Sequence, residues 1–223
     1  MDAKTEELKA AHDVLAEVYA DRLAGALEVM PIDRTVLSLF CELTLAADLG
    51  AAVGDVGCGT GRLAPYLAAQ GLSPHGVDLS PEMVRVAQRD YPGFSFEVAD
   101  LRALPFGDAS LAGAVCWYSL LFLPPATRAT AFSELARIVK PGGYLVMAFK
   151  AGDGELRRGG RSMGLGIEFD AYWLSPEEME RRVTEAGFGT VFWAGRPADG
   201  QESTPQGYLL ARRTDEHHRQ AGG

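Results

Sequence analysis

The architecture of this chain is set by the run Val53-Gly54-Asp55-Val56-Gly57-Cys58-Gly59-Thr60-Gly61. Its apolar beginning predicts a short buried strand at 52–56, and a helix is expected directly afterwards, at 62–70. Three glycines at alternate positions predict a tight turn between these two elements, with bare backbone exposed to a ligand. The question that the run leaves open is the charge of that ligand.

Short apolar runs and amphipathic segments alternate through the rest of the chain. Strands are expected at 74–77, 94–99, 111–117, 144–149, 190–194 and 207–211. Helices are expected at 5–24, 31–49, 126–139 and 176–186, with another opened by Ser80-Pro81. The residues Lys140-Pro141-Gly142-Gly143 are expected to form a turn, and 151–166 either a mobile flap with three arginines or a solvated loop. The alternation predicts an α/β fold whose parallel sheet is covered by helices on both faces.

Composition narrows the class of protein. A chain of 223 residues with 47% hydrophobic residues suggests one domain, and a net charge of −9 argues against a nucleic-acid binder, which usually shows a basic face. Cys41, Cys58 and Cys116 are scattered without metal-ligand spacing, which indicates a reducing cytoplasm and no metal site. We expect no signal segment, no membrane span and a disordered tail at 214–223.

The glycine turn and its neighbours favour one kind of ligand. A dinucleotide site requires G-x-G-x-x-G, whereas the third glycine here comes one residue early, and Asp55 would repel a diphosphate. S-adenosylmethionine has an ammonium, a sulfonium and a carboxylate, and we expect its ammonium near Asp55 or the Gly57 carbonyl. Asp78 ends the next strand, where a carboxylate accepts hydrogen bonds from ribose hydroxyls. The alternative is a purely structural turn.

Four segments resemble motifs of the class I S-adenosylmethionine-dependent methyltransferases. Residues 53–61 resemble the first motif, 76–83 the second, 98–101 the segment that meets the adenine, and 135–149 the turn into the fifth strand. The resemblance covers about residues 50–150. It implies a Rossmann-like, doubly wound sheet of seven strands in the order 3-2-1-4-5-7-6, with the last strand antiparallel. Residues 1–213 would form one domain, with 1–49 as two N-terminal cap helices and 50–213 as the core.

The resemblance also implies a set of cofactor contacts. Asp78 would bind the ribose, Asp100 and Leu101 would meet the adenine, and Met83 would pack on it. The cofactor set is Tyr19, Asp55, Gly57, Cys58, Gly59, Gly61, Asp78, Leu79, Met83, Asp100, Leu101 and Cys116. Three of them have an ordinary alternative: a turn cap for Asp100, core packing for Met83, and a core aromatic rather than part of a lid for Tyr19.

Methyl transfer places few demands on catalytic residues. It is an in-line displacement with a neutral thioether leaving, so alignment and exclusion of water can do most of the work. Candidates to face the substrate are Tyr19, Trp117, Tyr118 and Tyr172, with Trp117 and Tyr118 on opposite faces of their strand. In one resembling branch a histidine follows Trp-Tyr-Ser, but Phe122 holds that place here.

The remaining histidines, among them His12 and His75, are expected to be structural or solvated. The sequence therefore predicts transfer of a methyl group from S-adenosylmethionine, giving S-adenosylhomocysteine, to an oxygen or nitrogen of a small molecule. Alternatives are a methyltransferase acting on RNA or protein, a catalytically silent module that binds the cofactor, and, as a weaker fourth, an NAD-dependent oxidoreductase. No nucleic-acid or membrane partner is expected, and the sequence does not indicate an oligomeric state.

Overall fold

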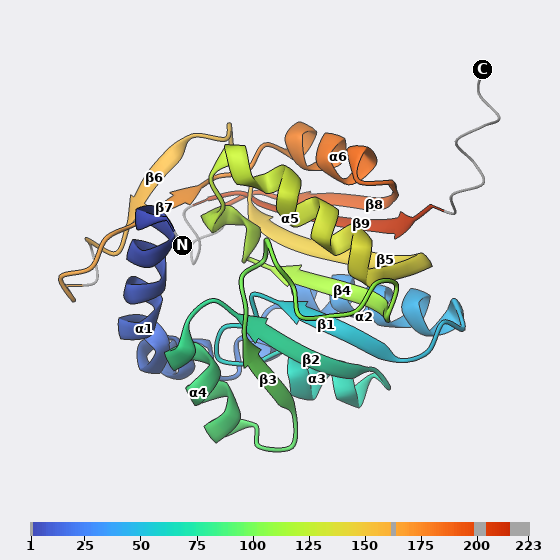
Figure 1. Cartoon of the computed structure of the whole chain (residues 1–223), viewed down its shortest axis with the longest axis horizontal. Helices are drawn as coiled ribbons and strands as arrows, with labels where there is room; N and C mark the ends of the chain where they lie inside the picture. Colours follow the sequence, from blue (N-terminus) through green and yellow to red (C-terminus); the bar gives the residue numbers. More distant parts are fainter. Residues whose placement is uncertain (1, 162–163, 199–203, 215–223) are drawn as a thin grey trace.

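A seven-stranded sheet forms the centre of the computed structural model, which describes residues 2–161, 164–198 and 204–214. Its order is β3-β2-β1-β4-β5-β9-β8 (Figure 1). The strands are β1 Ala52–Val56, β2 Ser73–Asp78, β3 Ser95–Val98, β4 Leu111–Trp117, β5 Val139–Lys150, β8 Phe188–Arg196 and β9 Gln206–Arg213. Strands β1 to β5 pair in parallel, and β9 runs antiparallel to both β5 and β8. The expected order and the antiparallel last strand are confirmed.

Helices cover both faces of the sheet, as expected for alternating β and α segments (Figure 1). They are α1 Ala3–Leu23, α2 Pro31–Ala46, α3 Ala64–Ala69, α4 Pro81–Asp90, α5 Pro125–Ile138 and α6 Pro176–Glu185, with 3₁₀ turns η1 Ala26–Val29 and η2 Leu120–Phe122. Side chains of α2, such as Phe40, pack with Val53 and Val115 on one face. Side chains of α5 and α6, such as Phe132, pack with Cys116 on the other. Neighbouring residues of one strand therefore enter different cores.

The helix starts follow the expected capping residues. The Ser80 side chain accepts a hydrogen bond from the Met83 N–H and opens α4, and Ser175 does the same for Glu178 at the start of α6. In each case a proline takes the first helical position, where no backbone N–H is needed. None of the helices in the described part of the chain is long and apolar enough to cross a bilayer.

Two expectations about the second half of the chain were wrong. The strand β5 begins at Val139, which pairs with Leu111, but the register shifts before Tyr144 pairs with Gly113, and Gly142 has φ of 81°. The stretch 140–143 is therefore a bulge inside the strand and not a separate turn ahead of it. Part of the segment 151–166 is also regular: β6 Leu156–Gly159 pairs antiparallel with β7 Phe169–Tyr172. The side chain of Phe169 is buried and lies where a side chain at Gly159 would have to be, so tertiary packing orders a segment that is rich in glycine and arginine.

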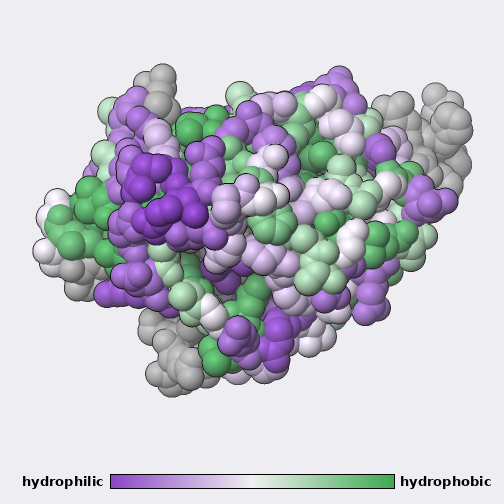
Figure 2. Space-filling model, turned by 90° about the horizontal axis from the view of Figure 1, so that it is seen from below, coloured by the Kyte–Doolittle hydropathy of each residue, from purple (hydrophilic) through white to green (hydrophobic). Residues whose placement is uncertain are grey.

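The helix α1 and the β6–β7 ribbon stand across the C-terminal ends of the parallel strands (Figure 1). Ion pairs join α1 to α4 on the outside: Glu17 lies 2.7 Å from Arg85 and 2.8 Å from Arg89. Hydrophilic side chains gather on the face seen from below, where these helices lie (Figure 2). The expected tail at 214–223 falls outside the described residues, apart from Thr214.

Candidate functional site

A cavity of about 670 Å³ opens at the C-terminal ends of the parallel strands, under α1. Its wall comes from segments far apart in the sequence: α1, the glycine turn, the ends of β2 and β4, η2 and the β6–β7 ribbon. Most of the expected site residues line it: Tyr19, Gly57, Cys58, Gly59, Asp78, Leu79, Met83, Asp100, Leu101, Trp117 and Tyr118. Asp55, Gly61, Cys116 and Tyr172 do not. The structure thus brings together the ends of three strands that the sequence predicted at one rim.

The glycine turn presents bare backbone to the cavity at Gly59. A side chain built at Gly59 would meet nothing within 4 Å, whereas one at Gly61 would lie 2.7 Å from the Phe96 ring. Both residues have positive φ, 54° and 79°, which favours glycine. Gly61 is therefore required for packing against β3, and of the two it is Gly59 that leaves the open approach to a ligand.

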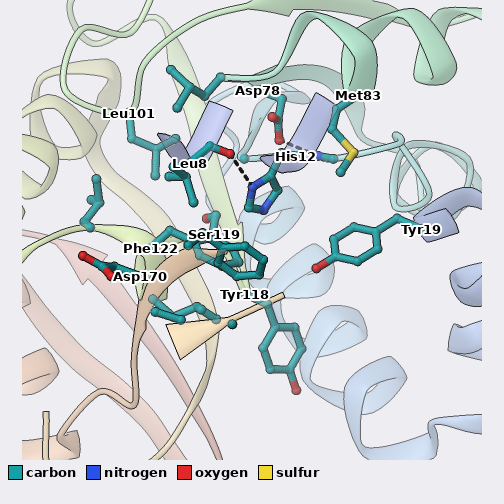
Figure 3. Close-up of a pocket in the computed structure, with 18 of the residues that line it drawn as sticks. Leu8, His12, Tyr19, Asp78, Met83, Leu101, Tyr118, Ser119, Phe122 and Asp170 are labelled. Atoms are coloured by element: carbon teal, nitrogen blue, oxygen red, sulfur yellow. Dashed lines mark hydrogen bonds between the residues drawn. The ribbon is translucent and has the colours of Figure 1, made fainter. Parts of the chain in front are cut away.

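Asp78 is held at the rim by backbone groups. Its carboxylate accepts hydrogen bonds from the N–H of Gly59 at 2.8 Å and from the N–H of Ser80 at 2.9 Å. Burial raises its pKa, and these hydrogen bonds oppose the shift. One carboxylate thus ties the glycine turn to the start of α4 and still lines the cavity (Figure 3).

Asp55 is buried and does not line the cavity. Its side chain is only 1% exposed, and neither oxygen has a hydrogen-bond partner among the described residues. Burial raises its pKa to about 7. The strand β1 lies inside the sheet, between β2 and β4. The expected contact of Asp55 with the ammonium of a cofactor stays a prediction.

Cys116 and Tyr172 do not line the cavity either. Cys116 is fully buried in the core under α5, because β4 is apolar along its whole length. The ring of Tyr172 lies 5.0 Å from the Arg128 guanidinium and packs with the same core. These two side chains support the wall from behind.

The residues expected to meet the adenine have the alternative structural roles and also line the cavity. Asp100 accepts a hydrogen bond from the backbone N–H of Arg102 at 2.8 Å, which is the turn-capping role, and it also lines the cavity. Met83 is 1% exposed and packs with Leu15 of α1, which is the core role, and it too lines the cavity. Leu101 completes this wall.

Trp117 and Tyr118 both line the cavity, although strand alternation predicted opposite faces. The strand ends at Trp117, and Tyr118 has φ of 60°, so the backbone turns and the alternation stops there. The Trp117 ring N–H donates to Asp33 at 3.3 Å, and the Ser119 hydroxyl donates to the Val56 carbonyl at 2.7 Å. These bonds fix the turn after β4 against β1 and α2.

Two residues of α1 form the roof. Tyr19 and His12 are seven positions apart, about two helical turns, and therefore share one face of α1. Both line the cavity (Figure 3), and burial raises the pKa of Tyr19. Tyr19 also packs with the core cluster of α1 and α4, so both of its expected roles apply. His12 was expected to be structural or solvated; its spacing from Tyr19 was the signal that could have identified it.

Positive charge gathers around the cavity in spite of the overall charge of −9. Seven cationic side chains line it, namely Lys4, Lys9, Arg62, Arg102, Lys150, Arg157 and Arg158, against the carboxylates of Asp78, Asp100 and Asp170. The sequence analysis did not identify Arg62, which follows the glycine turn. Its Nη1 is buried and has no hydrogen-bond partner among the described residues, and burial lowers its pKa. An anionic group could be accepted there.

The described residues contain no group of three histidine, cysteine, aspartate or glutamate side chains placed to hold a metal ion. The polar groups of the cavity are instead backbone N–H groups, carboxylates, one imidazole and several cations. This mixture suits a ligand that carries charges of both signs and a polar sugar.

Comparisons with known proteins agree with this geometry. Residues 53–143 match a family described as a methyltransferase domain. The chain is 34% identical over 181 residues to the malonyl-[acyl-carrier protein] O-methyltransferase of Erwinia billingiae, covering 74% of this chain and 71% of that protein. It is 29% identical over 183 residues to the O-methyltransferase cnsE of Penicillium expansum, covering 79% of this chain. The match spans only 60% of that relative's length.

Solved structures share the fold. The 1,6-didemethyltoxoflavin-N1-methyltransferase of Burkholderia thailandensis superposes with a TM-score of 0.64 at 22% identity, over 96% of this chain and 92% of that chain. An S-adenosylmethionine-dependent methyltransferase from Methanosarcina mazei superposes with a TM-score of 0.67 at 22% identity, over 75% of this chain and 94% of that chain.

Proposed function

Because the chain belongs to the family of class I S-adenosylmethionine-dependent methyltransferases, we propose that it transfers a methyl group from S-adenosylmethionine to an oxygen or nitrogen of a small molecule. The single observation that carries the proposal is the enclosed cavity that combines Asp78, the bare backbone at Gly59 and an aromatic roof. We also propose that residues 1–213 act as one domain, with 1–49 covering the core.

The residues present fit the cofactor. Asp78 would accept hydrogen bonds from the ribose hydroxyls, and Asp100, Leu101 and Met83 would surround the adenine. The Nη1 atom of Arg62, which has no hydrogen-bond partner among the described residues, would meet the carboxylate of the methionine part. Arg62 would thus bind the anionic end of the cofactor, whereas the ammonium was expected near Asp55 or the Gly57 carbonyl.

The chain's own residues supply alignment rather than covalent chemistry. S-adenosylmethionine, when bound, supplies an electrophilic methyl group. The rings of Trp117, Tyr118 and Tyr19 would shape the space around it, and an aromatic face near a sulfonium contributes about 0.5–2 kcal/mol. The roof of α1 would exclude water, so that the acceptor and the methyl group meet in line.

A small molecule is favoured over RNA as the acceptor because α1 covers the cavity and the total charge is negative. A similar solved structure supports the same class, because it contains bound 1,6-didemethyltoxoflavin and S-adenosylhomocysteine. The malonyl-[acyl-carrier protein] relative provides the second candidate, an acid carried on a protein. The cations near the cavity mouth would suit a carboxylate in either case.

Turnover of labelled methyl groups tests the proposal. The protein would be incubated with methyl-labelled S-adenosylmethionine and a panel of phenols, amines and carboxylic acids, free and on an acyl-carrier protein. The proposal predicts label in a small-molecule product. Label found only in RNA or protein would favour the alternative acceptors, and binding of the cofactor without turnover on any substrate would indicate a silent module.

A further inference from the structure

The imidazole of His12 lies inside the cavity that the proposed function assigns to methyl transfer. Its ring centroid is 4.7 Å from that of Phe122 and 5.3 Å from that of Phe169. Figure 3 shows the ring between Asp78 and Phe122, below the carbonyl of Leu8. Phe122 brings no ionisable group to this wall, but α1 brings an imidazole to it from the opposite side.

One hydrogen bond determines which ring nitrogen of His12 can accept a proton. The Nδ1 atom lies 2.9 Å from the carbonyl oxygen of Leu8. A carbonyl oxygen only accepts hydrogen bonds, so Nδ1 must carry the hydrogen, and in the neutral ring the lone pair is then on Nε2. His12 is therefore held in the tautomer that a general base requires.

The carboxylates that line the cavity in the described part of the chain are already engaged. Asp78 accepts two backbone hydrogen bonds, Asp100 accepts from the Arg102 side chain, and Asp170 pairs with Arg158. The contacts of Asp100 and Asp170 stabilise their ionised forms, and the pKa of each is lowered. Burial raises the pKa of Asp78, but both of its oxygens already accept backbone hydrogen bonds. None of these three carboxylates is as free to accept a proton from a substrate hydroxyl as the Nε2 atom of His12.

The other polar side chains near the methyl-facing end are poor bases. Burial raises the pKa of the Tyr19 hydroxyl and of the Cys58 thiol, so both stay protonated at neutral pH. The Ser119 hydroxyl donates its hydrogen to the Val56 carbonyl. Compared with these side chains, the imidazole has a nitrogen lone pair that can accept a proton.

We propose that His12 is the general base of this site, and that the methyl acceptor is a weakly acidic hydroxyl on an aromatic or enolic ring. The Nε2 lone pair takes the hydroxyl proton while the oxygen attacks the methyl carbon. The O–CH3 bond forms, the C–S bond breaks with its electron pair passing to sulfur, and neutral S-adenosylhomocysteine leaves. The imidazolium then returns its proton to water. A flat acceptor would stack among Phe122, Phe169 and Tyr19.

The pH dependence of this step depends on the titratable groups around His12. The titratable groups that face His12 are Asp78 on β2 and Tyr19 on α1, whereas η2 and β7 present Phe122 and Phe169. The Asp78 carboxylate is the charge that interacts with His12, and it stabilises the imidazolium formed during transfer. A general base acts only in its unprotonated form, so the rate on a phenol should rise with pH.

The test compares His12→Gln with the wild-type protein, and uses His75→Gln as the matched control because His75 lies on β2 outside the cavity. The probes are phenol, the more acidic para-nitrophenol and aniline, each with methyl-labelled S-adenosylmethionine. His12→Gln should lower kcat on phenol by about 10²- to 10⁴-fold, the usual contribution of a general base. It should affect para-nitrophenol far less, because that acceptor already ionises near neutral pH.

A second readout separates this role from a structural one. Affinity for S-adenosylhomocysteine should be unchanged in His12→Gln, and the rise of kcat/KM with pH on phenol should disappear. An unchanged rate and pH profile on phenol, or an equal loss of S-adenosylhomocysteine affinity, would overturn the proposal. Methylation of aniline alone would contradict the proposal that the acceptor is a hydroxyl. Methylation of no probe, while S-adenosylhomocysteine still binds, would contradict it as well. Failure to bind S-adenosylhomocysteine would instead contradict the proposed function.

Discussion

Among single residues, the two aspartates of the first two strands have opposite environments. Asp78 lies at the strand end and is held by the N–H groups of Gly59 and Ser80, whereas Asp55 is buried in the sheet without a hydrogen-bond partner among the described residues. The first is placed to bind a ligand. The second is a destabilised charge, whose pKa is raised by burial to about 7.

Asp78→Asn should weaken binding of S-adenosylhomocysteine. The amide keeps the shape of the carboxylate but has one acceptor oxygen instead of two and no charge, so hydrogen bonds to a charged group worth about 1.5–3 kcal/mol would be lost. That corresponds to roughly tenfold to a hundredfold in the dissociation constant, measured by calorimetry. Asp48→Asn, at an exposed residue with φ of 54° before β1, is the matched control and should bind normally. Equal affinity in both variants would refute the ribose assignment.

Asp55→Asn should change how stability depends on pH. An acid whose pKa is raised on folding binds its proton more tightly in the folded state, so the free energy of unfolding falls as pH rises from about 4 to about 7. This one group contributes up to about 4 kcal/mol to that fall. Denaturant titrations across this pH range should show a flatter profile in Asp55→Asn than in Asp108→Asn, which removes an exposed carboxyl. Parallel profiles would show that Asp55 titrates normally.

Local rules explain which site residues could be predicted. The spacing of Gly59 and Asp78 requires only a strand, a turn and the next strand end, so the sequence sufficed for both. The burial of Asp55 and Cys116 was not predicted, because the direction of a strand side chain depends on the cores that form around it. His12 was missed because a helix face shows its function only when the opposite wall, here Phe122, is known.

Among the elements, α1 is the one that closes the cavity, and its attachment depends on the start of α4. The Ser80 hydroxyl accepts from the Met83 N–H at 3.1 Å and donates to the Asp13 carboxylate of α1 at 2.5 Å. Asp13 also accepts from the N–H of Glu82 at 3.3 Å. One fully buried serine thus caps a helix and holds the roof.

Ser80→Ala should therefore cost more than the loss of a helix cap. Removing the cap alone costs about 1 kcal/mol, and the lost partner of Asp13 should add about another 1–3 kcal/mol. Ser175→Ala is the matched control, since Ser175 caps α6 in the same way without contacting α1. Chemical denaturation should show a larger loss for Ser80→Ala, and amide hydrogen exchange should show α1 less protected. Equal losses would mean that Ser80 does not hold the roof.

The helices and strands near the first motif were predicted correctly from the sequence. Those beyond the fifth strand were predicted less well. Capping serines and alternating apolar runs determine helices and strands locally, as at Ser80 and Ser175. The β6–β7 ribbon was missed because its residues have no alternating pattern. It is ordered instead by Phe169 packing under Gly159 and by ion pairs of Arg158 with α1.

Across the whole molecule, charge is distributed unevenly. The protein has a net charge of −9, but more cations than carboxylates line the cavity. Four of these cations, Lys4, Arg102, Arg157 and Arg158, are ion-paired with carboxylates, so most of the positive charge at the cavity is already balanced. The fold itself was predictable at this scale, because the order of the motifs determines the order of strands β1 to β5. The side chains that line the cavity could not be predicted, because the lining depends on how α1 and the β6–β7 ribbon pack together.

The ligand of the glycine turn is the central claim, and a denaturation measurement tests it most directly. The free energy of unfolding would be measured with S-adenosylmethionine or S-adenosylhomocysteine at a hundred times its dissociation constant, and with NAD at the same concentration. Binding of either nucleoside should add about 2.7 kcal/mol, and NAD should add nothing. Stabilisation by NAD, with no effect of S-adenosylmethionine or S-adenosylhomocysteine, would contradict the account.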